Sequence, residues 1–211
     1  MPSPCKLILL HGLGSNREGM QPLADELHGS VAPEETILLE GPFDVGKGTA
    51  SAFAWFTPPD DAHRALDDPK RASPSGLEKS VKKIHDQIDQ FVQGGTPTNQ
   101  IYLIGHSQGG AAAITAGLMY PQTLGGVISI AGYLTLDEAM HPSVTKTPFR
   151  FHHALEDDNV SCYWADYARN AMEELGLNCQ VKFWDFSENP HAIHPPQIEA
   201  ISEWIRGTTL L

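Results

Sequence analysis

The fold of this 211-residue chain is decided by the stretch Ile101-Tyr102-Leu103-Ile104-Gly105-His106-Ser107-Gln108-Gly109-Gly110-Ala111. Four apolar residues run into Gly105, and small residues typical of a buried helix follow Gly110. The Gly-x-Ser-x-Gly pattern indicates a nucleophile elbow, a tight strand-to-helix turn that presents Ser107. Such a turn strains the serine backbone, so the residues two places away must be small, as Gly105 and Gly109 are. An ordinary glycine-rich turn is the alternative, and the apolar flanks argue against it.

Outside this stretch, short apolar runs alternate with helical periods along the chain. We expect strands at residues 7–10, 36–39, 101–104, 126–130, 148–153 and 181–186. We expect helices at residues 20–28, 77–92, 108–119, 163–175 and 196–205. This alternation predicts an α/β fold in which helices flank a mostly parallel central sheet. A chain of this length that is 41% hydrophobic can bury one sizeable core, so we expect residues 1–211 to form a single domain.

The helix expected over residues 77–92 has the clearest signals. Its apolar residues recur every three or four positions, and Gly94-Gly95 should end it. Ser75 and Glu78 have the spacing of a capping box at its start.

Segment 41–75 has no sustained period and contains several prolines, glycines and acidic residues. A loop this long inside a compact domain is usually functional or mobile. Its centre includes Trp55 and Phe56, which are too apolar for full exposure to solvent. We therefore expect a flap near the active site, with Trp55 and Phe56 in the wall of the substrate pocket. A loop fixed to the surface by aromatic anchors is the alternative.

Composition excludes several kinds of partner. The net charge of −12 at pH 7 argues against nucleic acid or an anionic membrane surface. The apolar run at 7–10 is too short for a signal-peptide core or a membrane span. Three widely spaced cysteines suggest neither a zinc site nor a disulfide framework, so we expect a cytoplasmic protein with reduced thiols. The ten histidines lack helical ligand spacing, so we expect no metal.

A serine nucleophile needs a histidine base, and the base needs an acid to orient it. In hydrolases with such an elbow these partners follow the serine in the order acid, then histidine, each after a strand. The acid candidates after the run at 148–153 are Glu156, Asp157 and Asp158. The histidine candidates after the run at 181–186 are His191 and His194. The spacing alone does not choose within either set.

The same chemistry needs two backbone N–H groups to stabilise the oxyanion. One should come from Gln108, the residue after the nucleophile, and the other from an early strand-to-helix loop. The loop Leu10-His11-Gly12-Leu13-Gly14 suits this role because its glycines allow a close approach of the backbone to a ligand. We expect the N–H of Leu13 to be the second donor.

Together, Leu10-His11-Gly12-Leu13-Gly14 and Gly105-His106-Ser107-Gln108-Gly109-Gly110-Ala111 resemble the small carboxylesterase/phospholipase family of α/β-hydrolases, which includes the acyl-protein thioesterases. The Ser-Gln-Gly-Gly core is a specific mark of that family. The family's His-Gly-x-x-Asp-x-x-Val pattern is matched at His153, Asp157 and Val160, which selects Asp157 as the acid. The family histidine precedes a short stretch that leads into the last helix, and His191 fits that place.

The resemblance implies an α/β-hydrolase fold and a serine hydrolase that cleaves carboxylic esters or thioesters through an acyl-enzyme. Ser107 would be the nucleophile, His191 the base and Asp157 the orienting acid, with no cofactor. Small esters or thioesters are the expected substrates, and acylated proteins and lysophospholipids are narrower options. The family also implies a monomer or a weak homodimer. A retired hydrolase fold that binds a ligand, and an acyltransferase that uses the same three residues, are the alternatives.

Overall fold

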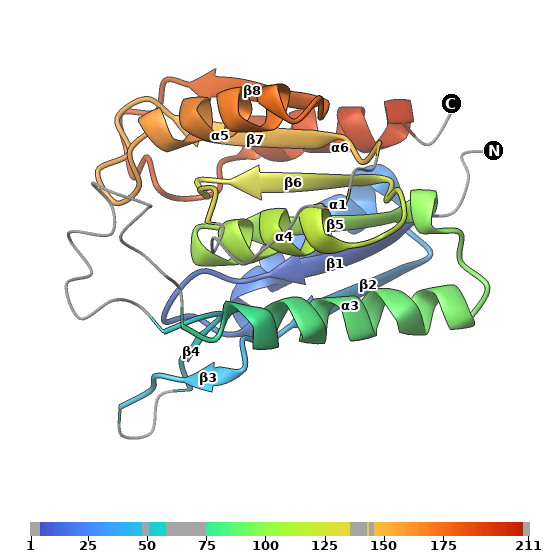
Figure 1. Cartoon of the computed structure of the whole chain (residues 1–211). Coiled ribbons are helices and arrows are strands. Elements are labelled where there is room, and N and C mark those ends of the chain that lie inside the picture. Colours follow the sequence, from blue (N-terminus) through green and yellow to red (C-terminus); the bar gives the residue numbers. More distant parts are fainter. Residues whose placement is uncertain (1–4, 48–50, 58–74, 136–142, 144–145, 209–211) are drawn as a thin grey trace.

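The computed structural model describes residues 5–47, 51–57, 75–135, 143 and 146–208 (Figure 1). Six parallel strands form its main sheet in the order β2-β1-β5-β6-β7-β8. Their bounds are Lys6–Leu10 (β1), Glu35–Leu39 (β2), Ile101–His106 (β5), Gly126–Ile130 (β6), Phe149–Ala154 (β7) and Cys179–Trp184 (β8). Each strand lies within two residues of a predicted apolar run, and the predicted α/β fold is confirmed.

Helices cover both faces of this sheet (Figure 1). Their bounds are Gln21–Val31 (α1), Leu77–Gln93 (α3), Gln108–Met119 (α4), Tyr163–Glu174 (α5) and Pro195–Thr208 (α6). The α3, α4 and α5 helices pack on one face, and α1 and α6 pack on the other, so the sheet separates two hydrophobic clusters. The helix predictions are confirmed to within three residues. No helix in the described part of the chain is long and apolar enough to cross a membrane.

The strand order changes direction between β1 and β5. From β1 the chain moves to β2 on one side, and later returns to β5 on the other side of β1. The chain therefore leaves β1 and β5 toward opposite faces of the sheet, to α1 on one face and to α4 on the other. In open parallel sheets, ligands bind outside the carboxyl ends of the strands at such a switch point. Ser107 and the loop 11–15 both lie there.

The start of α3 differs from the prediction. The N-cap is Gly76, at φ 89°, and no side chain caps the helix, so the expected capping box of Ser75 and Glu78 is wrong. The carbonyl of Ser75 instead accepts the amide of Thr57 at 3.0 Å. A Cβ at Gly76 would lie 2.3 Å from the Phe43 ring. Tertiary packing around this glycine, rather than a local cap, determines where the helix begins.

Segment 41–75 is not wholly irregular. Strands β3 (Phe43–Asp44) and β4 (Phe53–Ala54) pair as an antiparallel ribbon. The ribbon is joined to the loop after β1, because the amide of Phe53 donates to the carbonyl of Ser15 at 2.7 Å and the amide of Gly14 donates to the carbonyl of Phe53 at 3.0 Å. Residues 48–50 and 58–74 of the predicted flap lie outside the described residues.

Candidate active site

Ser107 occupies a strained turn between β5 and α4. Its backbone has φ 53° and ψ −121°, in a region that residues with a Cβ rarely adopt. A Cβ at Gly105 would lie 2.2 Å from the carbonyl oxygen of Gly109, and one at Gly109 would lie 2.3 Å from that of His11. Main-chain atoms cannot withdraw from such contacts as a flexible side chain can. The two glycines thus make the turn possible.

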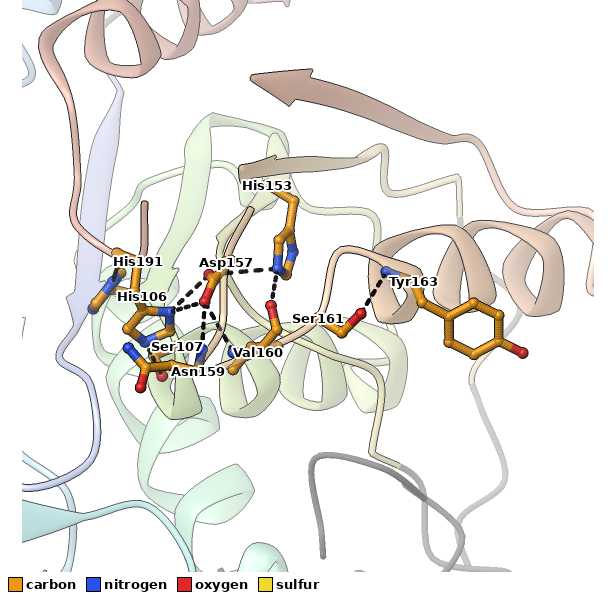
Figure 2. Close-up of polar contacts among 9 residues, drawn as sticks. All are labelled: His106, Ser107, His153, Asp157, Asn159, Val160, Ser161, Tyr163 and His191. Carbon is orange, nitrogen blue, oxygen red and sulfur yellow. Dashed lines mark hydrogen bonds and ion pairs between the residues drawn. The ribbon is translucent and has the colours of Figure 1, made fainter. Parts of the chain in front are cut away.

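His191 joins the serine to the acid (Figure 2). Its Nε2 lies 3.0 Å from the Oγ of Ser107, and its Nδ1 lies 2.8 Å and 3.0 Å from the two carboxylate oxygens of Asp157. A carboxylate only accepts hydrogen bonds, so Nδ1 carries the proton and the neutral ring leaves Nε2 free to accept the serine hydroxyl. These residues come from three different loops, yet they form one bonded chain.

The other histidine candidate, His194, is engaged elsewhere. Its Nε2 donates to the carbonyl of Asn189 at 3.0 Å, and its ring stacks on Phe186 with the centroids 4.0 Å apart. His194 therefore supports the connection between β8 and α6, which also carries His191.

Asp157 is buried, whereas its neighbours Glu156 and Asp158 are exposed. Its Oδ1 accepts the amides of Asn159 at 3.0 Å and Val160 at 2.9 Å, in addition to the bond from His191. Burial by itself would raise the pKa of this carboxyl, but these hydrogen bonds outweigh burial and lower the pKa below its ordinary value. The acid is thus held ionised beside the imidazole.

The loop of Asp157 is held by a side chain near the end of β7. The buried His153 donates its Nε2–H to the carbonyl of Val160 at 2.7 Å, and this nitrogen lies 3.6 Å from the Oδ2 of Asp157. Burial lowers the pKa of His153, which favours the neutral ring. The His153 side chain therefore shapes the acid loop without taking part in the bonded chain.

The loop after β1 approaches the serine closely. A Cβ at Gly12 would lie 3.5 Å from the Cβ of Ser107. The loop is held from beneath by His11, whose Nδ1 donates to the carbonyl of Gly12 at 2.8 Å and whose Nε2 accepts the amide of Gly41 at 3.0 Å. Leu13 borders the cavity beside the serine. The amide of Gln108 opens α4 and has no acceptor within the helix.

The Gln108 side chain has a role that the sequence did not reveal. It is buried, accepts the amide of Trp55 at 2.8 Å through Oε1 and donates to the carbonyl of Phe56 at 2.9 Å through Nε2. The indole N–H of Trp55 donates to the carbonyl of His11 at 2.8 Å. One amide side chain therefore connects segment 53–57 to the elbow.

These bonds place Trp55 and Phe56 differently from the sequence prediction. The two side chains are 0% and 2% exposed and pack in the core. Neither borders the cavity found beside Ser107 among the described residues. The expected position in the pocket wall is corrected, because the main-chain bonds to Gln108 and the indole bond to His11 hold this segment against the core.

The cavity beside the serine has a volume of about 670 Å³, within the usual range for small-molecule sites. It lies between the loop after β1, the start of α1 and the connection that leads into α6. Its apolar lining includes Leu13, Met20, Pro22, Leu23, Ala192, Ile193, Pro195 and Ile198. Ser107 and His191 open onto it. The serine hydroxyl is therefore accessible to a ligand with an apolar part.

Comparison with known proteins agrees with this geometry. The family model described as Phospholipase/Carboxylesterase matches residues 2–209. The chain belongs to the phospholipase/carboxylesterase family. The family predicted from the two glycine-containing motifs is thus confirmed.

Individual members of the phospholipase/carboxylesterase family extend the comparison. The crystal structure of Arabidopsis thaliana SOBER1, which is named a carboxylesterase, superposes with a TM-score of 0.83 at 26% identity, covering 98% of this chain and 99% of that one. Acyl-protein thioesterase 1 of Aspergillus fumigatus is 28% identical over 62% of this chain and 56% of its own length. An Oryza sativa protein named as a probable inactive carboxylesterase is 24% identical over 94% of this chain and 82% of its own. The relatives of this chain thus carry the names of both active and inactive proteins.

Proposed function

We propose that this protein is a serine hydrolase that cleaves carboxylic esters or thioesters through an acyl-enzyme. The observation that carries the proposal is the hydrogen-bonded chain from Asp157 through His191 to Ser107, which ends on a serine in a strained turn. Activation of a serine needs a base in contact with it and an acid that fixes the tautomer of the base. Membership of the phospholipase/carboxylesterase family supports the same reaction class.

In the first half-reaction, the Oγ of Ser107 forms a bond to the acyl carbon while its proton passes to Nε2 of His191. Asp157 stabilises the resulting imidazolium. The amides of Leu13 and Gln108 bind the oxyanion. When the bond from carbon to the leaving oxygen or sulfur breaks, His191 returns the proton to the leaving group.

In the second half-reaction, water takes the place of the leaving group. His191 accepts a proton from the water as its oxygen attacks the acyl carbon, and then gives that proton to Ser107 as the acid product departs. The net change is hydrolysis, and the enzyme returns to its starting state. Apart from the substrate and water, these steps use side chains and amides of this chain.

We infer the substrate class from the cavity. A space of about 670 Å³ with a mixed lining, apolar at Leu23 and Ile198 and acidic at Asp25 and Glu26, fits an acyl or alcohol group of small to medium size. Acylated proteins and lysophospholipids are narrower options, and the likeness to an acyl-protein thioesterase favours including thioesters in any screen.

The test is hydrolysis of p-nitrophenyl esters from acetate to long chains by the wild type and by Ser107→Ala. We expect turnover by the wild type, with a chain-length optimum, and its loss in Ser107→Ala. Adding an alcohol acceptor and measuring how the acyl group divides between water and alcohol would separate hydrolysis from acyl transfer. A folded wild type without activity on any ester or thioester would overturn the proposal in favour of a ligand-binding protein.

A further inference from the structure

His106 precedes Ser107 in the chain, and its side chain contacts the loop that carries the base (Figure 2). Its Nε2 lies 2.7 Å from the main-chain carbonyl oxygen of His191. A carbonyl oxygen only accepts hydrogen bonds, so Nε2 of His106 must carry a proton and donate it. The two imidazole rings lie with their centroids 5.0 Å apart. The strand that ends at the nucleophile is thus bonded directly to the main chain of the base.

The loop of His191 needs such an anchor. It spans the connection between the end of β8 at Trp184 and the start of α6 at Pro195, where no ladder of strand bonds holds it. Its main-chain bonds are local, because the amide of Ala192 and the side chain of His194 both bond to the carbonyl of Asn189, and Ile193 packs against the hydrophobic cluster of α1 and α6. The loop meets the elbow through His191 itself, whose ring bonds to Ser107 and whose main-chain carbonyl accepts the bond from His106.

The opposite side of the His106 ring faces the loop after β1. A Cβ at Gly12 would lie 3.1 Å from Nδ1 of His106. The ring therefore lies between the loop expected to bind the oxyanion and the loop that carries His191. Burial lowers the pKa of His106, which favours the neutral ring that donates from Nε2 and leaves Nδ1 unprotonated.

We propose that His106 is a positioning residue: its Nε2–H bond to the carbonyl of His191 holds the base at hydrogen-bonding distance from Ser107. This inference rests on the proposed function, since it assigns His191 the role of base. His106 borders the cavity beside Ser107, but the role assigned to it is to hold His191 and not to bond to the reacting atoms. Its effect is on the alignment of His191, where a displacement of about 1 Å can reduce turnover about 100-fold.

Three substitutions separate this role from simple filling of space. In His106→Gln, the side-chain amide nitrogen can take the place of Nε2 and donate to the same carbonyl. In His106→Asn, the shorter amide reaches only the region of Nδ1. In His106→Phe, a ring remains without any donor. A matched control is His85→Phe, because His85 donates in the same way to the carbonyl of Ala116 at 2.8 Å, between α3 and α4.

We expect kcat for p-nitrophenyl acetate to fall about 10- to 100-fold in His106→Phe and His106→Asn, with KM changed less than about 3-fold. His106→Gln should recover most of kcat, and His85→Phe should keep it. Thermal unfolding of each variant would establish that the variants compared are folded. Wild-type kcat in folded His106→Phe, or a loss in folded His106→Gln equal to that in His106→Phe, would overturn the inference.

Hydrogen exchange provides a readout that does not depend on turnover. Backbone amides of residues 187–193 should exchange faster in His106→Phe than in the wild type, and His106→Gln should restore the slower rate. If the wild type hydrolyses no ester, the proposed function fails, whereas this exchange pattern still tests the contact between His106 and the loop. Equal exchange in the wild type and His106→Phe would overturn the inference even in an active enzyme.

Discussion

Asp157→Asn is the substitution that most directly tests how the three residues work together. The carboxylate receives two main-chain amides and the Nδ1–H of His191, so an asparagine oxygen can keep the amides of Asn159 and Val160 while its NH₂ group faces the imidazole. A donor at that position forces the ring to carry its proton on Nε2. His191 could then no longer accept the proton of Ser107, although little else would move.

The expected loss in kcat is about 10⁴-fold, the size found when the acid of a serine triad is made neutral. At about 1.36 kcal/mol for each factor of ten, this corresponds to about 5 kcal/mol of transition-state stabilisation. The assay is the rate on a p-nitrophenyl ester to which the wild type responds. Asp158→Asn is the matched control, because the neighbouring carboxylate is exposed and should change the rate less than about 2-fold.

Two results would refute this reasoning. Equal losses in Asp157→Asn and Asp158→Asn would mean that the general charge of the loop, and not one bond to His191, supports catalysis. Wild-type turnover in Asp157→Asn would mean that the tautomer of His191 is fixed by other contacts. Either result would remove Asp157 from the proposed mechanism while leaving Ser107 to be tested on its own.

Three further predictions concern stability and the elbow. Because the pKa of Asp157 is lowered in the fold, its ionised form stabilises the protein above the ordinary aspartate pKa near 3.9, and this stability is lost as pH falls through the folded-state pKa. Tm should therefore drop less steeply below pH 4 in Asp157→Asn than in the wild type, and parallel curves would contradict this. Gln108→Leu leaves two buried main-chain groups without partners, so urea unfolding should show a loss of about 2–6 kcal/mol, whereas an unchanged midpoint would speak against the connection to segment 53–57. Gly105→Ala should abolish ester turnover, because the added Cβ would lie 2.2 Å from a main-chain oxygen, and an active Gly105→Ala enzyme would show that the elbow can relax. The control is Gly29→Ala in α1, where the space around the added Cβ is open, so it should raise the free energy of unfolding by about 0.5–1 kcal/mol.

The sequence predicts the parts of this molecule that depend on local pattern. All six strands of the main sheet follow short apolar runs, and α4 has the bounds predicted for it, residues 108–119. The start of α3 could not be predicted in this way. Ser75 and Glu78 have the right spacing for a capping box, but Gly76 packs against Phe43, which lies over thirty residues away. The cytoplasmic location and the monomeric or weakly dimeric state stay predictions.

Segment 53–57 shows the same limit within the site. Three aromatic residues in an irregular segment suggest either a pocket wall or a buried anchor, and hydrophobicity is equal in both cases. The choice depends on hydrogen bonds from Gln108, which belongs to the elbow motif but whose side chain carries no sequence signal for a distant partner. The Gln108 side chain bonds to main-chain groups of Trp55 and Phe56, which are the same for every residue type and so cannot be predicted from the sequence.

Contacts from side chain to main chain also explain how three distant loops reach a common geometry. His153, one residue before the end of β7, donates to the carbonyl of Val160 in the acid loop, and His106 at the end of β5 donates to the carbonyl of His191 in the base loop. In each case a rigid strand end fixes a loop that bears a member of the bonded chain. Since a carbonyl is present at every residue, such anchors depend on where a loop passes and not on which residue it contains. Substitution of either histidine is therefore expected to change the alignment of the site without changing Ser107, Asp157 or His191.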